Sequence, residues 1–420
     1  MERTELSQGV FFNKITDTRF KKNCVSVFFI SELDSETAAN DAVVPRILTK
    51  ENVNLPSISD ISNRLSELYA ADIGHGVGAL GDSRTAEFSV TVLDDRYALE
   101  GENLLKEGLA VLLDCLFKPI IVDGAFKSDT VKTEKQSLID DIEAELNEKR
   151  SYALNRARAL LCAGEPAEFN PNGTYEQANN ITIGDAFEAY RRMLGKASIE
   201  IISIGCNSFE SVPAMWNEAF ETAINRFNIS REPVFPKSTL SPLKTEPAAK
   251  TEHENIVQSK AVYGFKPTSP VKDEVMTVFT KVFGGTPNGK LFLNVREKMS
   301  LCYYCAGQYS STKGIVTVDC GVEKGNIDNA KAEILRQLGE ISRGNVTDDE
   351  ITQAKLSLEN DSVTINDKIN SLVSFYIGRI YKGEIVKPEE WALRCLKVTV
   401  GEVVSASQLL RLDSEYVLTN

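Results

Sequence analysis

The sequence predicts an α+β protein built from two related halves, and three observations support this prediction. The chain has 420 residues, a length that exceeds one ordinary hydrophobic core and favours two domains of roughly 200 residues each. A proline-rich stretch at 232–254 divides it. The same order of expected helices and strands is found on both sides. Closely spaced strands and grouped helices favour an antiparallel-rich sheet covered by helices in each half.

The expected elements of the first half begin with a buried strand at 24–30, where the longest apolar run lies. A helix follows at 59–70, because apolar residues recur there at helical spacing. Two strands are expected next, at 73–80 and 86–93, and the second alternates as a strand with one buried face does. The half ends with helices, one at 102–117 and one long helix at 125–162.

The second half repeats this order. Helical spacing of apolar residues predicts helices before and after a glycine-rich turn, and alternation predicts two strands after them. Two further helices close the half. The expected ranges, in chain order, are 274–283, 289–298, 301–309, 314–322, 327–342 and 347–381.

Local signals mark several boundaries. Thr347 and Glu350 have the spacing of a capping box, which fixes the start of the last helix, and Gly383 is its expected stop. Four prolines fall in the stretch 232–254, and proline at this density breaks helices and extends the backbone. We therefore predict an N-terminal domain over 1–231, a linker over 232–254 and a C-terminal domain over 255–420.

Composition narrows the class of protein. Apolar residues make up 42% and charged residues 25% of the chain, as in soluble globular proteins, and no apolar run approaches the ~20 residues of a membrane span. The polar N-terminal segment lacks a secretory signal pattern, so a cytoplasmic location is expected. The eight cysteines are too sparse for a disulfide framework, and buried, reduced thiols are expected.

The formal net charge is −13. An acidic surface repels phosphate backbones, which argues against a nucleic-acid partner. It favours basic peptides or a basic protein surface, although acidity also serves solubility alone.

One segment of the second half carries a recognisable pattern. Arg296 and Tyr303 stand seven residues apart, downstream of Gly284, Gly285 and Gly289. With the duplicated order of elements, this segment resembles the insulinase/pitrilysin zinc peptidases over nearly the whole chain, in particular short two-domain bacterial members and mitochondrial processing peptidase subunits. The resemblance implies that Arg296 and Tyr303 donate hydrogen bonds to a substrate carbonyl and that the glycine loop touches bound peptide. Without it, an Arg paired with a nearby Glu and a half-buried strand Tyr explain the same residues.

The metal motif of that family is missing. The resemblance implies H-x-x-E-H in the first half, where this chain has A-V-V-P-R. Ala42 and Arg46 match the two His ligands, Pro45 matches the general base, and Asp141, seven residues after Glu134, matches the third ligand. A zinc hydrolase needs two imidazoles, a carboxylate ligand and a general base. We therefore expect no metal site, no cofactor and no catalysis by this chain alone.

These expectations converge on a noncatalytic insulinase-type subunit, an accessory to a metallopeptidase. It would form a heterodimer with a zinc-bearing paralogue and help to enclose and position a peptide or protein segment. The resemblance further suggests a noncatalytic bacterial member linked to elongation factor P modification. A stand-alone peptide-binding or scaffold protein, for example a homodimer, is the alternative. An unrelated thiol enzyme is disfavoured, because no Cys is paired in sequence with a credible base.

Other motifs have structural interpretations. The stretch 284–290, G-G-T-P-N-G-K, nearly matches a phosphate-binding loop, but it follows a helix and lacks the required hydroxyl at Leu291. A turn between helices is expected instead. Cys302 and Cys305 should lie on opposite faces of a strand as structural thiols. A charge run at 143–150 is expected on the solvated face of the long helix. His75 should lie in a hairpin strand.

Overall fold

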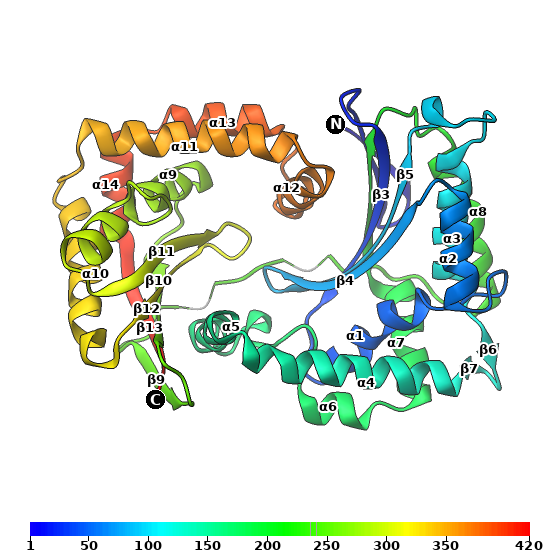
Figure 1. The fold of residues 1–420 in the computed structure, drawn as a ribbon, viewed down its shortest axis with the longest axis horizontal. Helices are drawn as coiled ribbons and strands as arrows, with labels where there is room; N and C mark the ends of the chain where they lie inside the picture. Colours follow the sequence, from blue (N-terminus) through cyan, green and yellow to red (C-terminus); the bar gives the residue numbers. More distant parts are fainter. Residues whose placement is uncertain (236, 241) are drawn as a thin grey trace. The chain divides into compact units, whose positions relative to one another are not determined.

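The computed structural model describes residues 1–235, 237–240 and 242–420. The chain forms two compact units (Figure 1). Unit 1 comprises Met1–Ala144, Phe169–Lys237 and Leu372–Ile377, and unit 2 comprises Glu145–Glu168, Ser238–Ser371 and Gly378–Asn420. Unit 2 thus includes a segment that precedes the proline-rich stretch 232–254. Pro236 and Ser241 of that stretch lie outside the described residues, and the domain bounds 1–231 and 255–420 stay predictions.

Unit 1 is built on a six-stranded sheet in the order β1-β2-β8-β3-β5-β4. Neighbours run antiparallel except β2 and β8, which run parallel. All eight residues of β8 are buried, as expected for a strand covered on both faces. The strands are β1 (Glu2–Ser7), β2 (Val10–Thr16), β3 (Lys22–Glu32), β4 (Asp72–Leu80), β5 (Ser83–Leu93) and β8 (Ser198–Gly205).

Helices cover this sheet. Helix α3 packs on β5 and beside α8, and α1 packs against α4 and α7. Aromatic rings fill the core, with Trp216 of α8 tilted on Phe29 and edge-on to Phe117. A two-stranded ribbon, β6 (Ile121–Val122) and β7 (Ala125–Phe126), precedes α4. The helices are α1 (Ala38–Leu48), α2 (Ile58–Glu67), α3 (Leu104–Phe117), α4 (Ser128–Ala144), α6 (Tyr175–Asn180), α7 (Ile183–Lys196) and α8 (Ser211–Arg226).

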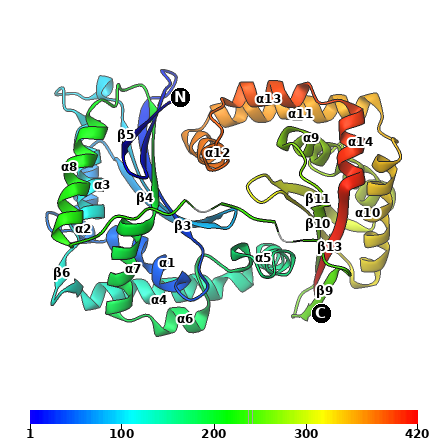
Figure 2. The same cartoon turned by 180° about the vertical axis from the view of Figure 1, so that it is seen from behind.

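Unit 2 has a five-stranded sheet in the order β11-β12-β10-β13-β9. Only β13 and β9 run parallel. Helix α14 packs against α9 and α10 (Figure 2). The strands are β9 (Ala248–His253), β10 (Ser259–Pro267), β11 (Cys302–Ser310), β12 (Ile315–Val322) and β13 (Leu410–Thr419). The helical segments are α5 (Lys149–Leu161), α9 (Asp273–Phe283), η4 (Phe292–Lys298), α10 (Ile327–Ser342), α11 (Asp348–Asn366), α13 (Pro388–Leu396) and α14 (Val400–Leu409). Helix α12 (Ile369–Tyr381) is divided, because its middle part, Leu372–Ile377, belongs to unit 1.

The expected repeat is confirmed by the sheet topology. The series β4-β5-β3-β8-β2 of unit 1 matches β11-β12-β10-β13-β9 of unit 2, with antiparallel pairs followed by one parallel pair in both. Strand β1 extends the sheet of unit 1 by one strand. The α+β prediction, two related halves each with an antiparallel-rich sheet and helices, is therefore confirmed.

The single long helix predicted at 125–162 is wrong. Ala125–Phe126 is strand β7, α4 ends at Ala144, and a short 3₁₀ turn at Glu145–Asn147 leads into α5. Tertiary packing overrides helix propensity here, because α5 packs on β10 and β13 of unit 2. The charge run at 143–150 is largely exposed, as expected, and Arg150 at its end also donates to Asp319 of β12 at 2.6 Å.

The helix predicted at 347–381 begins and stops as expected but is broken in the middle. The capping box is present, with the Thr347 hydroxyl accepting from the Glu350 amide at 3.2 Å. Gly383 adopts φ +75°, and its amide donates to Ile380 in the pattern of a Schellman stop. The break follows Asn366, whose side-chain amide donates to Glu389 of α13 at 2.7 Å. This hydrogen bond ties the last residue of α11 to α13, and α12 begins three residues later, at Ile369.

Buried charges hold the early segment Glu145–Glu168 in unit 2. The Glu165 carboxylate is buried beside Lys266, at 3.3 Å from its Nζ, and forms a second ion pair with Lys313. Lys266 and Asp413 are fully buried at 0% exposure, and Asp413 accepts from Lys244 at 2.5 Å. Because buried ammonium groups require compensating carboxylates, this cluster fixes the position of the chain after α5.

Replacing Glu165 with Gln should destabilise unit 2 by about 3 kcal/mol or more, because it leaves two buried lysines with one carboxylate fewer. The chain has two tryptophans, so Trp216→Phe leaves Trp391 of unit 2 as the fluorescent reporter in urea unfolding. Glu359→Gln, at an exposed site on α11, is the matched control and should cost under about 0.5 kcal/mol. Equal losses from the two variants would contradict the role of the cluster.

Candidate functional site

The positions that match the lost metal motif lie on α1 of unit 1. Ala42 and Pro45 are buried in the packing of that helix. Neither side chain carries a metal-binding atom or a titratable group, so neither can serve as ligand or base. Arg46, at the end of the same motif, is the one of the three whose side chain carries a charge. The chemistry of this position therefore depends on Arg46 and its partners.

Two cations, Arg46 of α1 and Lys50 just beyond the end of that helix, form ion pairs with carboxylates of α4 at this position. The Arg46 guanidinium donates to Asp141 at 2.6 Å and to the Ser137 hydroxyl at 3.2 Å. One turn later, Lys50 lies 3.6 Å from the Glu134 carboxylate. Residues seven apart share a helix face, so Glu134 and Asp141 both face α1. The structure brings Arg46 and Asp141 together as an ion pair, not as metal ligands.

Protonation at this position also disfavours a metal. Burial raises the pKa of Glu134, against the opposing effect of Lys50 and Arg46. Burial lowers the pKa of His75, and the charges of Arg46 and Lys50 lower it further. His75 lies in β4, as predicted, and its Nδ1 is 2.9 Å from the Thr49 hydroxyl. Two fixed cations beside one neutral imidazole repel a divalent ion. In the described part of the chain, no group of three or more His, Cys, Asp or Glu gathers to hold one.

In unit 2, a β-bulge presents Tyr303. The pairing of β11 with β12 shifts register between Cys302, opposite Val322, and Tyr304, opposite Gly321. Tyr303 is the extra residue, and it is 62% exposed. Bulges re-aim side chains and recur next to functional sites. A side chain predicted to contact substrate is thus turned out of the sheet at the edge strand.

The same bulge makes the predicted arrangement of Cys302 and Cys305 wrong. Strict alternation would place them on opposite faces, but the extra residue returns both to the same face. Both are buried, and their thiols share a hydrogen bond that lowers the pKa of Cys302 and raises that of Cys305. They remain free thiols within the sheet.

Arg296 lies on η4, where a π-helix replaces the expected α-helix. The wide turns are visible in backbone bonds from Met299 to Asn294 at 3.1 Å and from Leu301 to Val295 at 3.0 Å. The Arg296 side chain is 41% exposed, stacks over Phe292 at 4.6 Å and lies 3.6 Å from Glu297. π-helical turns occur often at functional sites. The guanidinium is accessible to a ligand, because an exposed pair of this kind is weak.

The glycine-rich loop is a turn that packs on the edge strand β11. The Gly284 carbonyl accepts from the Gly307 amide at 2.9 Å. A Cβ at Gly284 would lie 2.6 Å from the end of the Leu291 side chain and 3.0 Å from the Gly307 nitrogen, so a larger residue would require Leu291 to move. Lys290, the lysine of the near-match to a phosphate-binding loop, is buried against Glu350 of α11 at 2.7 Å. The expected turn is confirmed, and the Lys290 ammonium of this loop is paired with Glu350 instead of being free to bind a phosphate.

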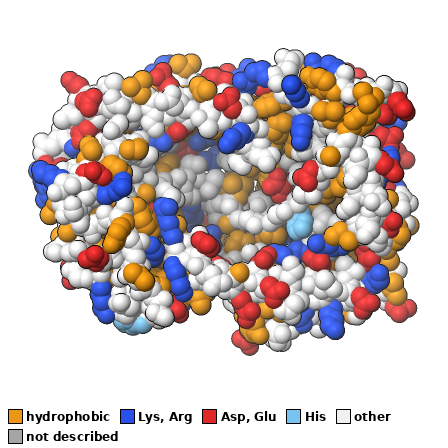
Figure 3. Space-filling model, viewed as in Figure 1, with side chains coloured by type: hydrophobic (Ala, Val, Ile, Leu, Met, Phe, Trp, Pro, Cys, Tyr) orange, Lys and Arg blue, Asp and Glu red, His pale blue; other side chains and the backbone are white. Residues whose placement is uncertain are grey.

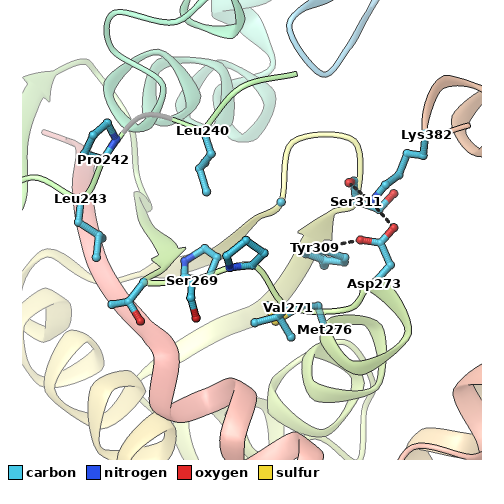
Figure 4. Close-up of a pocket in the computed structure, with 14 residues that line it drawn as sticks. Leu240, Pro242, Leu243, Ser269, Val271, Asp273, Met276, Tyr309, Ser311 and Lys382 are labelled. Carbon is cyan, nitrogen blue, oxygen red and sulfur yellow. Dashed lines mark hydrogen bonds and ion pairs between the residues drawn. The ribbon is translucent and has the colours of Figure 1, made fainter. Parts of the chain in front are cut away.

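Unit 2 also contains an open pocket of about 530 Å³ (Figure 4). Its wall is largely apolar, with Pro242, Leu243 and Met276 among the lining residues. Its two charged lining residues, Asp273 and Lys382, pair with each other, and Asp273 also accepts from the Tyr309 hydroxyl at 2.7 Å. This pocket offers apolar surface but no free reactive group.

Comparisons with known proteins place these features in a family context. Residues 180–358 match the family model described as the peptidase M16 inactive domain. The chain is 24% identical over 413 residues to the probable inactive metalloprotease YmfF of Bacillus subtilis, covering 98% of this chain and 96% of that protein.

Solved structures agree. A conserved protein from Enterococcus faecalis V583 aligns with a TM-score of 0.88 and 25% identity, covering 100% of this chain and 98% of that one. A peptidase M16 inactive domain from Pseudomonas fluorescens aligns with a TM-score of 0.77, 16% identity and coverage of 100% and 98%. The resemblance to insulinase-type peptidases without the metal motif is therefore confirmed, and the narrower link to elongation factor P stays a prediction.

Sequence reasoning missed two features of these sites. One is the contact of Arg46 with Asp141, although opposite charges at two former ligand positions were a usable signal. The other is the bulge at Tyr303. The sequence does not reveal it, because the extra residue is recognised only from the pairing of Cys302 and Tyr304 with neighbouring residues of β12.

The purified chain should hold far less than one zinc per molecule by elemental mass spectrometry, even after incubation with excess zinc and gel filtration. The reason is that Arg46 and Lys50 already neutralise the carboxylates of α4. An H-x-x-E-H paralogue handled in parallel is the positive control. One tightly held zinc per chain would contradict the ion-pair interpretation.

Arg46 and Asp141 should show a coupling of about 1 kcal/mol in a double-mutant cycle with Ala. The side chain of Arg46 is 16% exposed, which limits screening by solvent, whereas that of Asp141 is 60% exposed, which keeps the value modest. Urea unfolding with Trp216 as reporter, in a Trp391→Phe background, gives the four stabilities. The exposed pair Arg64–Glu67 on α2 is the control, with an expected coupling of about 0.3 kcal/mol. A coupling no larger than that of the control would show that Arg46 does not join α1 to α4.

Proposed function

We propose that this chain is a noncatalytic insulinase-type subunit that pairs with a zinc-bearing paralogue and helps to enclose and position a peptide substrate. The observation that carries the proposal is the contrast between the two former functional positions. The Arg46–Asp141 ion pair occupies the position that the resemblance matches to the metal site. Tyr303, in contrast, is turned outward on a bulge at 62% exposure, where it can meet a ligand.

The edge strands support a peptide ligand. Among the described residues, β11 is paired along one side by β12, and β4 is paired along one side by β5. An extended peptide can add to such an edge by main-chain hydrogen bonds. At β11, the Tyr303 hydroxyl and the Arg296 guanidinium are two donors suited to a peptide carbonyl.

Surface charge supports a peptide or protein partner over nucleic acid. Acidic and basic side chains are intermixed on the face shown in Figure 3, without a broad basic patch. The net charge of −13 favours basic segments. In the described part of the chain, no helix is both long and apolar enough to cross a bilayer. The proposal includes a cytoplasmic location, and an association with elongation factor P rests on the resemblance alone.

The decisive experiment is peptide cleavage by the H-x-x-E-H paralogue from the same genome, with and without this chain. Cleavage that requires the mixture, together with a 1:1 complex by light scattering, supports the accessory-subunit proposal. Equal cleavage by the paralogue alone, without complex formation, would reject it in favour of a stand-alone peptide-binding protein.

Arg296→Ala and Tyr303→Phe should each lower the kcat of the assembled pair about tenfold or more, because each removes a donor to the carbonyl oxygen. Assembly, measured by light scattering, should be unchanged. Arg343→Ala and Tyr175→Phe change an exposed Arg and an exposed Tyr elsewhere and serve as matched controls. Wild-type kinetics in both site variants would reject the role of this segment.

A further inference from the structure

A small pocket in unit 1, separate from the lost metal position and from the segment 296–303, gathers positive side chains. It measures about 170 Å³ and lies where β3, β5, the start of α1 and α7 approach one another. Its polar lining includes Ser31 of β3, Arg84 of β5, Thr37 and Asp41 of α1, and Arg192 and Lys196 of α7.

Two guanidinium groups share one carboxylate inside this pocket. Asp41 is 6% exposed, and one of its oxygens lies 3.1 Å from the Arg84 Nη2 while the other pairs with Arg192. The Thr37 hydroxyl also donates to Asp41, at 2.9 Å. The inner pocket therefore carries one positive charge more than its carboxylate balances.

Charges of both signs lie at the mouth. Lys196, Glu32 and Asp34 line the pocket and are exposed. Water screens such exposed charges strongly, so they influence the interior less than the buried groups do. Over the whole lining, the three cations Arg84, Arg192 and Lys196 face three carboxylates. The excess of one positive charge is confined to the inner group of Arg84, Arg192 and Asp41, and Asp34 also attracts Arg192, whose side chain is 36% exposed.

Two buried N–H groups of Arg84 lack a hydrogen-bond acceptor. Its side chain is 4% exposed, and its Nε and Nη1 have no hydrogen-bond partner. Its Nη2 serves both Asp41 and, at 3.4 Å, the Ser31 hydroxyl. Burial, and then repulsion from Arg192, lower the pKa of Arg84 to about 9. Unpaired buried N–H groups are costly, so this guanidinium is arranged to receive an acceptor.

We propose that this pocket binds the carboxylate group of a small monoanionic ligand. A carboxylate matches the planar N–H donors of arginine and balances the single excess charge beside Asp41. A phosphate dianion would place a second negative charge near that carboxylate. Met193 and Val234 complete the lining with apolar surface, which suits a short aliphatic portion. This inference does not depend on the proposed function.

Calorimetric titration with sodium propionate at constant ionic strength tests the proposal. We expect saturable binding to the whole chain, weakened about tenfold in Arg192→Gln, which removes one charge-assisted hydrogen bond. Arg191→Gln is the matched control, because Arg191 is the adjacent residue of α7, similarly exposed, and pairs with Glu188. Binding by the control should stay within about twofold of wild type. Trp216 fluorescence verifies that unit 1 is folded in both variants.

Three results would overturn the proposal: no saturable propionate binding, equal weakening in the two variants, or tighter binding of inorganic phosphate than of propionate. A short peptide with a free or an amidated C-terminus separates the two sources of a carboxylate, since a peptide-terminus site loses binding on amidation. Wild-type crystals grown with trichloroacetate, a carboxylate that does not alkylate thiols, give an independent readout that needs no variant. An anomalous chlorine peak in the pocket supports the assignment, and its absence contradicts it.

Discussion

The Glu165 carboxylate, buried between Lys266 and Lys313, is the interaction on which unit 2 depends. Ammonium groups without a counter-charge are strongly disfavoured in an interior, so Glu145–Glu168 cannot leave without exposing or stranding them. Beside the charges, Ala153 and Ala157 of α5 pack on Val262, Tyr416 and Leu418 of the sheet. The apolar contacts attach α5 to the sheet of unit 2, and the Glu165 ion pairs fix the position of the chain after that helix. Unit 2 is therefore completed by residues that precede the linker.

The position that the resemblance matches to a metal site holds ion pairs instead. In a zinc site, a divalent ion would join α1 to a carboxylate of the long helix. Here Arg46 of α1 and Lys50, two residues beyond the end of that helix, provide the positive charge, and Asp141 and Glu134 of α4 provide the negative charge. The Arg46–Asp141 ion pair thus joins α1 to α4 through side chains alone.

The fold was predictable wherever one local pattern decides the structure. Phe88, Val90 and Val92 alternate in the sequence and are buried at 0–1% exposure in β5, and the capping box at Thr347 sets the start of α11. The break after Ala144 was not predictable, because the charged residues there are good helix formers and the strands that capture α5 are distant in sequence. The bulge at Tyr303 depends on the register of β11 against β12, which no single strand encodes. Arg84 gave no sequence signal either, since the unpaired state of its Nε and Nη1 arises only when β3, β5, α1 and α7 come together.

The placement of α5 in unit 2 has a consequence for biosynthesis. The helix is complete at Leu161, yet β10 and β13, on which it packs, end at Pro267 and Thr419. A nascent chain must therefore carry α5 without its final surroundings while more than half of the protein is still being translated. Exposed apolar surface at that stage invites aggregation. The alanines and the Arg and Lys residues of α5 keep that apolar surface small while its partner strands are still to be synthesised.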